Sequence, residues 1–191
     1  PFTAQSIAAM TTAHIRLVPS SNTALEAALD LQLLPAPSTI SAKSDPVVVG
    51  KGQIGAKVAG VYPDGTACDF KYAVVSGSSI AINETTGEIT TRELGNSTVR
   101  ITATYSGAYV DCTVNVKPSP ESISFTSATL QLGVGDELNL AERGLLVCNP
   151  TDSAAGYSFK TSNKKIVSVA ADGSIKAVKR GSANITATAH N

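Results

Sequence analysis

The residues of this sequence that could take part in acid–base or nucleophilic chemistry are few and lie far apart. His14 and His190 lie near the two ends of the sequence, and no histidine lies between them. A Ser-His-acid or Cys-His arrangement needs a histidine beside its nucleophile. We therefore interpret both histidines as exposed strand residues, and we predict no catalytic residues and no enzymatic activity.

The three cysteines, Cys68, Cys112 and Cys148, are spaced too widely for a short metal-binding or redox motif. The absence of a CxxC pair argues against a zinc site or a dithiol redox centre. Two interpretations stay open for Cys68 and Cys112: a disulfide between them, or two free thiols buried as small apolar residues. For Cys148 the sequence identifies no partner.

The acidic residues do not form a recognisable metal-binding cluster. Asp64, Asp136 and Asp172 lie in separate stretches rich in turn residues, and no DxDxDG-like loop occurs. Calcium requires about six to eight oxygen ligands that converge on one point. A calcium site near a linker between domains is one alternative, but we expect the turn carboxylates to accept backbone N–H groups instead. We predict no bound metal ion and no cofactor.

Aromatic side chains offer one candidate contact surface. The sequence has no Trp, five Tyr and four Phe, and Tyr105 and Tyr109 flank a short SGA segment. These two rings either form an exposed pair at the tip of a domain, or pack on the linker or the neighbouring domain.

The charge balance and the shortness of the apolar runs argue against two classes of partner. There are 15 basic and 15 acidic residues, so the formal net charge is zero. Proteins that bind nucleic acid usually carry a clustered basic face, and a membrane span needs about 18 consecutive apolar residues. Neither feature occurs, so we expect no nucleic-acid partner and no membrane insertion of this segment.

Short alternating segments predict an all-β protein. VRITATY (99–105) and YVDCTVNV (109–116) alternate apolar and polar residues with a period of two, and the SGA between them predicts a hairpin turn. Val99, Ile101 and Cys112 would then face the core. Further short apolar runs are separated by turn signals such as PDG, NETTG and LGN, a pattern typical of a Greek-key β-sandwich.

Internal repeats divide the chain. STISAKSDPVVVGKG (38–52) aligns with ESISFTSATLQLGVG (121–135) at an offset of 83 residues, and segments 87–104 and 173–188 align at offsets of 84 to 86. Two copies of one unit therefore occupy residues 38–191. Searching for such repeats comes first because a missed repeat changes the whole interpretation of the fold.

The same offset of 83 explains the N-terminal residues, since ALDLQLLPAPSTI (28–40) aligns with DCTVNVKPSPESI (111–123). A helix over 21–34 is the alternative, but the apolar residues hold the two-residue period of a strand. The expected divisions are the last strands of a truncated preceding module plus a linker, a complete module, and a module lacking its last strand: residues 1–37, 38–117 and 118–191.

The second copy resembles the bacterial immunoglobulin-like domain of group 2, the intimin and invasin type. The resemblance is carried by a leucine strand ending in Leu132-Gly133-Val134-Gly135, then Phe159 before Thr161-Ser162-Asn163, and then Asp172-Gly173. The first copy departs from this pattern, with Val74-Val75-Ser76 in place of the S-S-N element. The resemblance implies tandem immunoglobulin-like sandwiches outside the cytoplasm.

The function expected from these features is structural. Linkers with two prolines, PAPS and PSPE, favour extended geometry between modules, so the region would act as a semi-rigid stalk or spacer of an extracellular or cell-surface protein. Its expected partners are neighbouring immunoglobulin-like modules, and beyond them a host-surface protein or glycan. The alternatives are a display module of a phage particle, an adhesin tip that binds a receptor or glycan, and an accessory module of a secreted carbohydrate-active enzyme.

Overall fold

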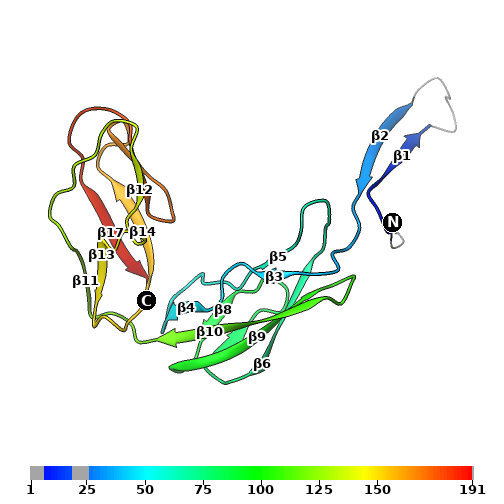
Figure 1. Ribbon diagram of the computed structural model, residues 1–191, viewed down its shortest axis with the longest axis horizontal. Helices are drawn as coiled ribbons and strands as arrows, with labels where there is room; N and C mark the ends of the chain where they lie inside the picture. The colour runs from blue at the N-terminus through cyan, green and yellow to red at the C-terminus, as the bar shows by residue number, and fades with distance from the viewer. Residues whose placement is uncertain (1–6, 19–25, 191) are drawn as a thin grey trace.

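The computed structural model of the protein describes residues 7–18 and 26–190. Every regular element in these ranges is a β-strand, which confirms the predicted all-β class. Along the chain the strands form a hairpin, a first sandwich (residues 41–117) and a second sandwich (residues 122–190), as Figure 1 shows. Within the described ranges, no strand of one group pairs with a strand of another.

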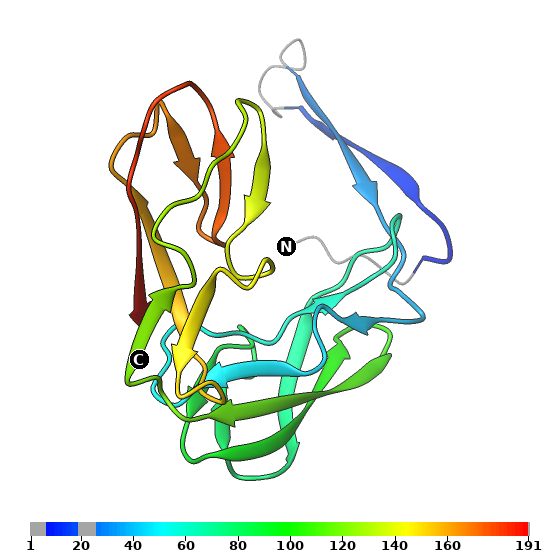
Figure 2. The same cartoon turned by 60° about the vertical axis from the view of Figure 1, so that its left-hand side comes forward.

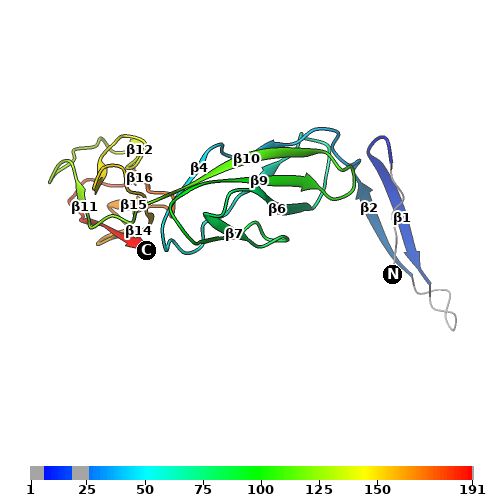
Figure 3. The same ribbon diagram turned by 90° about the horizontal axis from the view of Figure 1, so that it is seen from below.

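One layer of the first sandwich is a four-stranded sheet. Its strands, in spatial order, are β4 (Val47–Gly50), β10 (Tyr109–Lys117), β9 (Gly95–Ala103) and β6 (Phe70–Ser76). The predicted hairpin is present as β9 and β10, which pair antiparallel. β4 and β10 instead pair in parallel, so the beginning and the end of this sandwich lie side by side (Figure 3).

The other layer consists of short strands. It contains β3 (Ser41–Ala42), β5 (Gly60–Val61), β8 (Ile89–Thr91) and β7 (Ile80–Ile82). β3 pairs with β5, and β7 pairs with β8. The bridge between Lys57 and Glu88 joins these two pairs into one layer. Four strands facing four, with this order, make the first sandwich immunoglobulin-like.

The core of the first sandwich follows from the two-residue period. Side chains of alternating residues lie on one face of a strand, and those of β9 and β10 that were expected to face inward are buried. The buried apolar residues of these two strands are Val99, Ile101, Ala103, Cys112, Val114 and Val116. Three residues from other parts of the first sandwich belong to the same buried cluster: Val49, Val58 and Ile89.

The second sandwich repeats this arrangement with fewer paired strands. Its strands are β11 (Ser122–Phe125), β12 (Glu137–Asn139), β13 (Leu146–Asn149), β14 (Gly156–Thr161), β15 (Val167–Val169), β16 (Ser174–Ala177) and β17 (Ile185–His190). In one layer β11 pairs with β13, and β12, β16 and β15 form a sheet in that spatial order. The other contains β14 and β17. The strands of both layers can be followed in Figure 2.

The leucine strand expected near residues 130–133 is not formed. In the first sandwich the corresponding strand, β4, is held by its parallel partner β10. No described strand of the second sandwich corresponds to β10, and β14 alone pairs with β17. Without a counterpart of β10 among the described strands, the buried apolar residues of the second sandwich, within the described range, are Leu140, Ile175 and Ala177.

The N-terminal hairpin consists of β1 (Thr11–Leu17) and β2 (Ala27–Leu33), which pair antiparallel. The strand prediction for the end of the 21–34 segment is therefore confirmed over the described residues, and its first part, up to residue 25, lies outside them. Figures 1 and 3 show the hairpin standing apart from the first sandwich.

Candidate functional site: the linkers, a groove and the free thiols

The linker between the two sandwiches is fixed by hydrogen bonds on both sides. The backbone N–H of Ala154, in the second sandwich, donates to the carbonyl oxygen of Pro118 at 3.0 Å. The Ser119 hydroxyl donates to the carbonyl oxygen of Lys51, and the backbone N–H of Lys51 donates to the carbonyl oxygen of Lys117 at 2.8 Å. The linker therefore contacts both sandwiches.

A glycine allows the two sandwiches to approach closely at this linker. A Cβ atom added to Gly156, at the start of β14, would lie 2.9 Å from Nε2 of Gln53. The Gln53 side chain is itself held in place, because its Oε1 accepts the backbone N–H of Gly50 at 2.9 Å. A residue with a side chain at position 156 would have to displace Gln53.

The linker between the hairpin and the first sandwich is held in the same way. The backbone N–H of Ala67 donates to the carbonyl oxygen of Pro35 at 3.1 Å. Pro35 aligns with Pro118 at the repeat offset. Ala67 lies just before β6, and Ala154 lies just before β14. Pro37, two residues on, is fully buried. Each linker is thus attached to the sandwich that follows it by one equivalent backbone hydrogen bond.

A groove of about 650 Å³ lies beside the first linker. It is lined by residues 36–40 of the linker and residues 106–109 of the turn between β9 and β10. Tyr109 lines this groove and is 60% exposed. Tyr105, which is 75% exposed, does not line the groove.

The Tyr109 ring belongs to a small charged cluster on the outer face of the sheet. The guanidinium carbon of Arg100 lies 4.2 Å from the centre of the ring, a distance typical of a cation–π contact. Nε and Nη2 of Arg100 each donate to a carboxylate oxygen of Asp111 at 2.8 Å. These hydrogen bonds lower the pKa of Asp111 below its ordinary value. The arrangement presents a fixed, partly exposed aromatic surface at the rim of the groove.

The alternative of a Cys68–Cys112 disulfide is wrong for this structure, because both cysteines are free thiols. Strand register explains why they cannot meet. Phe70 pairs with Ala103, and Cys112 pairs with Val99, four residues further along β9. Four residues of strand span about 13 Å, whereas bonded cysteines have Cα atoms less than about 7 Å apart.

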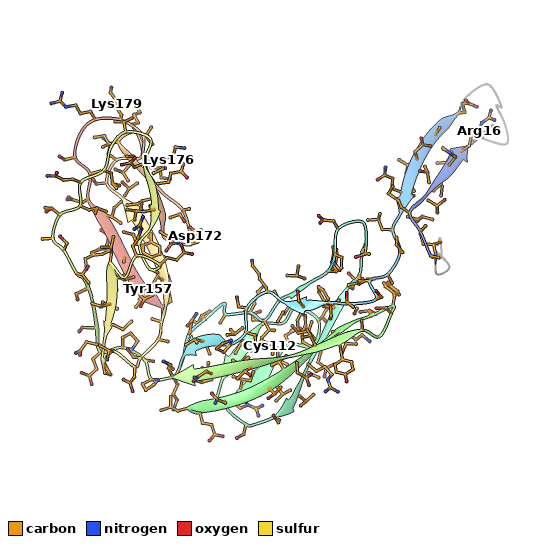
Figure 4. The ribbon with its side chains drawn as sticks, viewed as in Figure 1. Arg16, Cys112, Tyr157, Asp172, Lys176 and Lys179 are labelled. Carbon is orange, nitrogen blue, oxygen red and sulfur yellow. The ribbon has the colours of Figure 1, made fainter. Side chains whose placement is uncertain are left out.

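Cys112 instead behaves as a core residue, which was the other interpretation. Its side chain is buried, and Sγ donates to the carbonyl oxygen of Ser44 at 3.2 Å. Burial, together with the Asp45 carboxylate, raises the pKa of the Cys112 thiol. The thiol therefore stays neutral around neutral pH, and Figure 4 shows it within the first sandwich.

Cys148 has a partner that the sequence did not indicate. Its Sγ lies 2.7 Å from the hydroxyl oxygen of Tyr157, which is labelled in Figure 4. Burial first, and then this contact, raise the pKa of Tyr157. The two residues lie on β13 and β14, on opposite sides of a loop, and an isolated cysteine and tyrosine in sequence carry no signal of such a pair.

The acidic turn residues act as acceptors for backbone groups. Oδ1 of Asp172 accepts the backbone N–H of Ser174 at 2.9 Å, which lowers the pKa of Asp172. Oδ2 of Asp136 accepts the N–H of Gly133 at 2.8 Å. Over residues 7–18 and 26–190, no three His, Cys, Asp or Glu side chains come together in a group that could hold a metal ion.

The two histidines lie apart from these features. His14 is exposed, and its Nδ1 lies 2.6 Å from Oδ1 of Asp30 on the neighbouring strand. His190 ends β17, on the second sandwich. In the described parts of the chain, no helix is long and apolar enough to cross a membrane.

Comparison with known proteins gives similarities to solved structures alone. No protein-family model matches the chain, and neither does any curated protein sequence. The extracellular domain of protocadherin GammaB4 is 13% identical, with a TM-score of 0.36, over 92% of this chain and 35% of that one. Human protocadherin-24 EC1-2 is 15% identical, with a TM-score of 0.31, over 74% of this chain and 76% of that one.

A third similar structure is the surface layer protein SbsC, domains 1–6. It is 13% identical, with a TM-score of 0.32, over 94% of this chain and 33% of that one. This chain therefore spans about a third of the length of the protocadherin GammaB4 and SbsC structures. At these TM-scores the fold assignment rests on the strand pairing described above.

Proposed function

We propose that this chain is a non-enzymatic segment of a tandem array of immunoglobulin-like modules, which acts as a semi-rigid stalk or spacer in an extracellular or surface-displayed protein. In this proposal residues 38–117 form a complete module and residues 118–191 a module without its last strand. Residues 1–37 contribute the closing strands of a preceding module and a linker, with residues 1–6 and 19–25 outside the described structure.

Equivalent strand pairs support the division into like modules. Ile82 pairs with Ile89 in the first sandwich, and Val169 pairs with Ile175 in the second. Gly87 and Gly173, which align in sequence, both accept a backbone hydrogen bond through their carbonyl oxygens, from Val58 at 2.9 Å and from Leu140 at 3.1 Å. Both glycines have positive φ angles, 69° and 85°, which residues with a side chain rarely adopt.

The hairpin shows the same equivalence. Leu29 pairs with Ile15 in the hairpin as Cys112 pairs with Val99 in the first sandwich. Leu29 and Cys112 align at the offset of 83 residues. The hairpin therefore has the register of the last two strands of a module.

The observation that carries the stalk proposal is the equivalent attachment of the two linkers, Ala67 to Pro35 and Ala154 to Pro118. A linker that is hydrogen-bonded to the following module cannot rotate freely about it. Proline further restricts the linker backbone. Because both linkers use the same contact, successive modules are held at a fixed spacing.

The parallel pairing of β4 with β10 supports a role under tension. β4 lies near the start of the module and β10 at its end, so a force applied to the two ends pulls these strands in opposite directions. The hydrogen bonds between them then share the load and must break together. A module with this pairing resists extension more than one whose end strands peel apart one bond at a time.

The stalk proposal is tested by the tumbling of the two sandwiches in solution, measured by ¹⁵N relaxation. We expect residues 41–117 and 122–190 to report one common rotational correlation time. The double variant Pro118→Gly, Pro120→Gly should give two shorter, separate times, because the linker backbone is freed. The matched control Pro63→Gly, in a turn of the first sandwich, should leave the common time unchanged. Independent tumbling of the unaltered protein would rule out a semi-rigid spacer.

The groove beside Tyr109 favours one second candidate, an adhesive role in which a module binds a glycan. An exposed ring at the rim of a groove is a surface on which the apolar face of a sugar can stack, and Arg100 and Asp111 offer polar contacts beside it. Binding of glycans to the full chain, lost in Tyr109→Ala and kept in Tyr105→Ala, would support this candidate.

A further inference from the structure

Two turns meet at the end of the second sandwich that lies away from the linker. One turn precedes β15, and the other follows β16. Together they carry four exposed basic side chains: Lys164, Lys165, Lys179 and Arg180. We call this surface the cationic tip, and Figure 4 shows Lys179 at that end of the sandwich.

Backbone hydrogen bonds bring the two basic pairs together, although they are separate in the sequence. The carbonyl oxygen of Ile166, which follows Lys165, accepts the backbone N–H of Val178 at 2.8 Å and that of Lys179 at 3.2 Å. A Cβ atom added to Gly181 would lie 2.7 Å from Cδ1 of Ile166. The missing side chain at position 181 therefore lets one turn pack closely against the other.

The backbone beneath the basic side chains is held by further hydrogen bonds. Oδ1 of Asn163 accepts the backbone N–H of Lys165 at 3.0 Å. Ser162 and Asn184 are joined twice, since each donates its backbone N–H to the other, at 2.9 Å in both cases. A ligand would thus meet turns that are already in place, which lowers the entropic cost of binding.

The four cations are not neutralised by the protein. Within the described residues no ion pair or side-chain hydrogen bond engages them. The acidic side chains at the start of β12 have other partners, because Glu137 accepts Nζ of Lys176 and Asp136 accepts the backbone N–H of Gly133. Like charges held close together repel one another, and a bound anion relieves that repulsion.

The first sandwich shows that the fold does not require cations at this surface. β7 corresponds to β15, and Gly95 aligns with Gly181. The residues that take the places of the four cations are therefore Gly77, Ser78, Glu93 and Leu94. There the Ser78 hydroxyl donates to the Glu93 carboxylate. The cationic tip is a property of the second sandwich alone.

The same comparison shows that a following module leaves this surface open. The second sandwich follows the first along the chain, yet Ser78 and Glu93 are exposed and Leu94 is 52% exposed. The two sandwiches instead approach each other at Gln53 and Gly156. By this equivalence the cationic tip is accessible in an array of modules.

We propose that the cationic tip binds an anionic polysaccharide, whose sugars carry sulfate or carboxylate groups. Several cations at one place suit a chain with repeated negative charges, because each contact releases counterions from it. Arg180 can donate two hydrogen bonds to one carboxylate or sulfate group. The same turns supply exposed hydroxyl and amide groups for the sugar hydroxyls, from Asn163, Ser182 and Asn184. This surface is separate from the groove beside Tyr109, and its binding does not depend on the stiffness of the linkers.

The composition and shape of the cationic tip disfavour a nucleic acid as the partner. Proteins that bind single strands stack the bases on aromatic side chains, and segments 161–166 and 178–184 contain none. Proteins that read a duplex place a helix or a β-ribbon in its major groove. The cationic tip consists of two short turns.

Calorimetric titration of the full chain with dextran sulfate tests the proposal, with neutral dextran as the uncharged control ligand. The unaltered protein should bind dextran sulfate alone, and its affinity should fall by about tenfold or more between about 50 and 200 mM salt. The double variant Lys164→Gln, Lys179→Gln removes one cation from each turn. It should weaken binding by about tenfold and reduce the slope of log affinity against log salt concentration to about half.

Two further variants separate the cationic tip from general charge. Lys43→Gln, Lys71→Gln removes two exposed lysines of the first sandwich and should bind like the unaltered protein, as should Lys164→Arg, Lys179→Arg. Circular dichroism of each variant should be unchanged, because the substituted side chains are exposed. Equal losses in the two glutamine variants, binding of neutral dextran with the same affinity, or tighter binding of a DNA oligonucleotide of equal charge would each overturn the proposal.

Discussion

Ile101 and Ile185 occupy matching positions in the two sandwiches but differ in burial. Ile101 is completely buried between the layers, whereas Ile185, on β17, is half-buried. Truncating a fully buried isoleucine removes its contacts and leaves a cavity, whereas truncating a half-buried one mainly exposes a smaller side chain to water.

Ile101→Ala should therefore lower the free energy of unfolding of the first sandwich by about 2–5 kcal/mol. The matched variant Ile185→Ala should lower that of the second sandwich by much less. Urea denaturation followed by circular dichroism measures both values. Equal losses at the two positions would contradict the difference in burial on which this prediction depends.

The Cys112 thiol makes the stability of the first sandwich sensitive to alkaline pH. Burial raises its pKa above the ordinary value of 9.0. In the unfolded chain the thiol loses its proton near that ordinary value, while the folded protein keeps the proton to higher pH. The contribution is therefore fully present below pH 9.0 and is lost as the pH rises through the folded pKa.

We expect the free energy of unfolding of the first sandwich to fall as the pH rises above 9.0, and to fall less steeply in Cys112→Val. Valine keeps the apolar volume without a titrating group. A weaker dependence should persist, because burial also raises the pKa of Tyr72. Denaturation series at several alkaline pH values measure the slopes, and identical slopes in the two proteins would exclude the buried thiol as a cause.

At the scale of single elements, Gly87 joins the two halves of the short-stranded layer. Its φ angle is 69°, and an added Cβ would lie 2.4 Å from the carbonyl oxygen of Val58. The backbone cannot move away without breaking the hydrogen bond from Val58 N–H to Gly87. Gly65 has a similar φ angle of 78°, but open space around the position of its Cβ.

Gly65→Ala should cost about 1–2 kcal/mol, the strain of a left-handed residue with a side chain. Gly87→Ala should cost clearly more, because it adds a steric clash to the same strain. Thermal unfolding of the two variants, compared with the unaltered protein, separates strain from clash. Similar melting temperatures for both variants would show that the layer adapts at Gly87.

The sequence was sufficient to predict the elements whose signal is local. The two-residue period predicted β9 and β10, their hairpin and their buried residues, because each alternating side chain reports which face of a strand is covered. The free-thiol interpretation of Cys112 followed from the same pattern, whereas the disulfide alternative failed because register along the sheet is not visible in the sequence.

Features that depend on long-range contacts escaped prediction. The strand at residues 130–133 was expected from its resemblance to β4, but that strand requires a parallel partner. The Ala67–Pro35 and Ala154–Pro118 hydrogen bonds join backbone atoms, which almost every residue type supplies, so no pattern of residues reveals them.

At the scale of the whole molecule, the two sandwiches differ in the size of their buried apolar cores. Ten buried residues form one apolar cluster in the first sandwich. In the second, the apolar residues that are fully buried are Leu140, Ile175 and Ala177 within the described range. Stability from apolar burial scales with the area removed from water, so the second sandwich should unfold first.

Urea denaturation of the full chain should therefore show two transitions, with the second sandwich unfolding at the lower concentration. Amide hydrogen exchange assigns the order, because residues 122–190 should exchange faster than residues 70–117. Limited proteolysis should accordingly cut within 122–190 before the first sandwich. One cooperative transition for both sandwiches would show that the linker couples them more strongly than their separate cores imply.

The attachment of each linker through main-chain atoms has a consequence for how such a protein can change over generations. The two shared hydrogen bonds use only backbone groups of Pro35, Ala67, Pro118 and Ala154, so they are compatible with divergence at the two alanines, whereas Gly156 must stay without a side chain beside Gln53. Units can then be duplicated, deleted or exchanged while the angle at each joint is inherited with the backbone. In the proposed stalk, the number of units would then set the reach of the molecule.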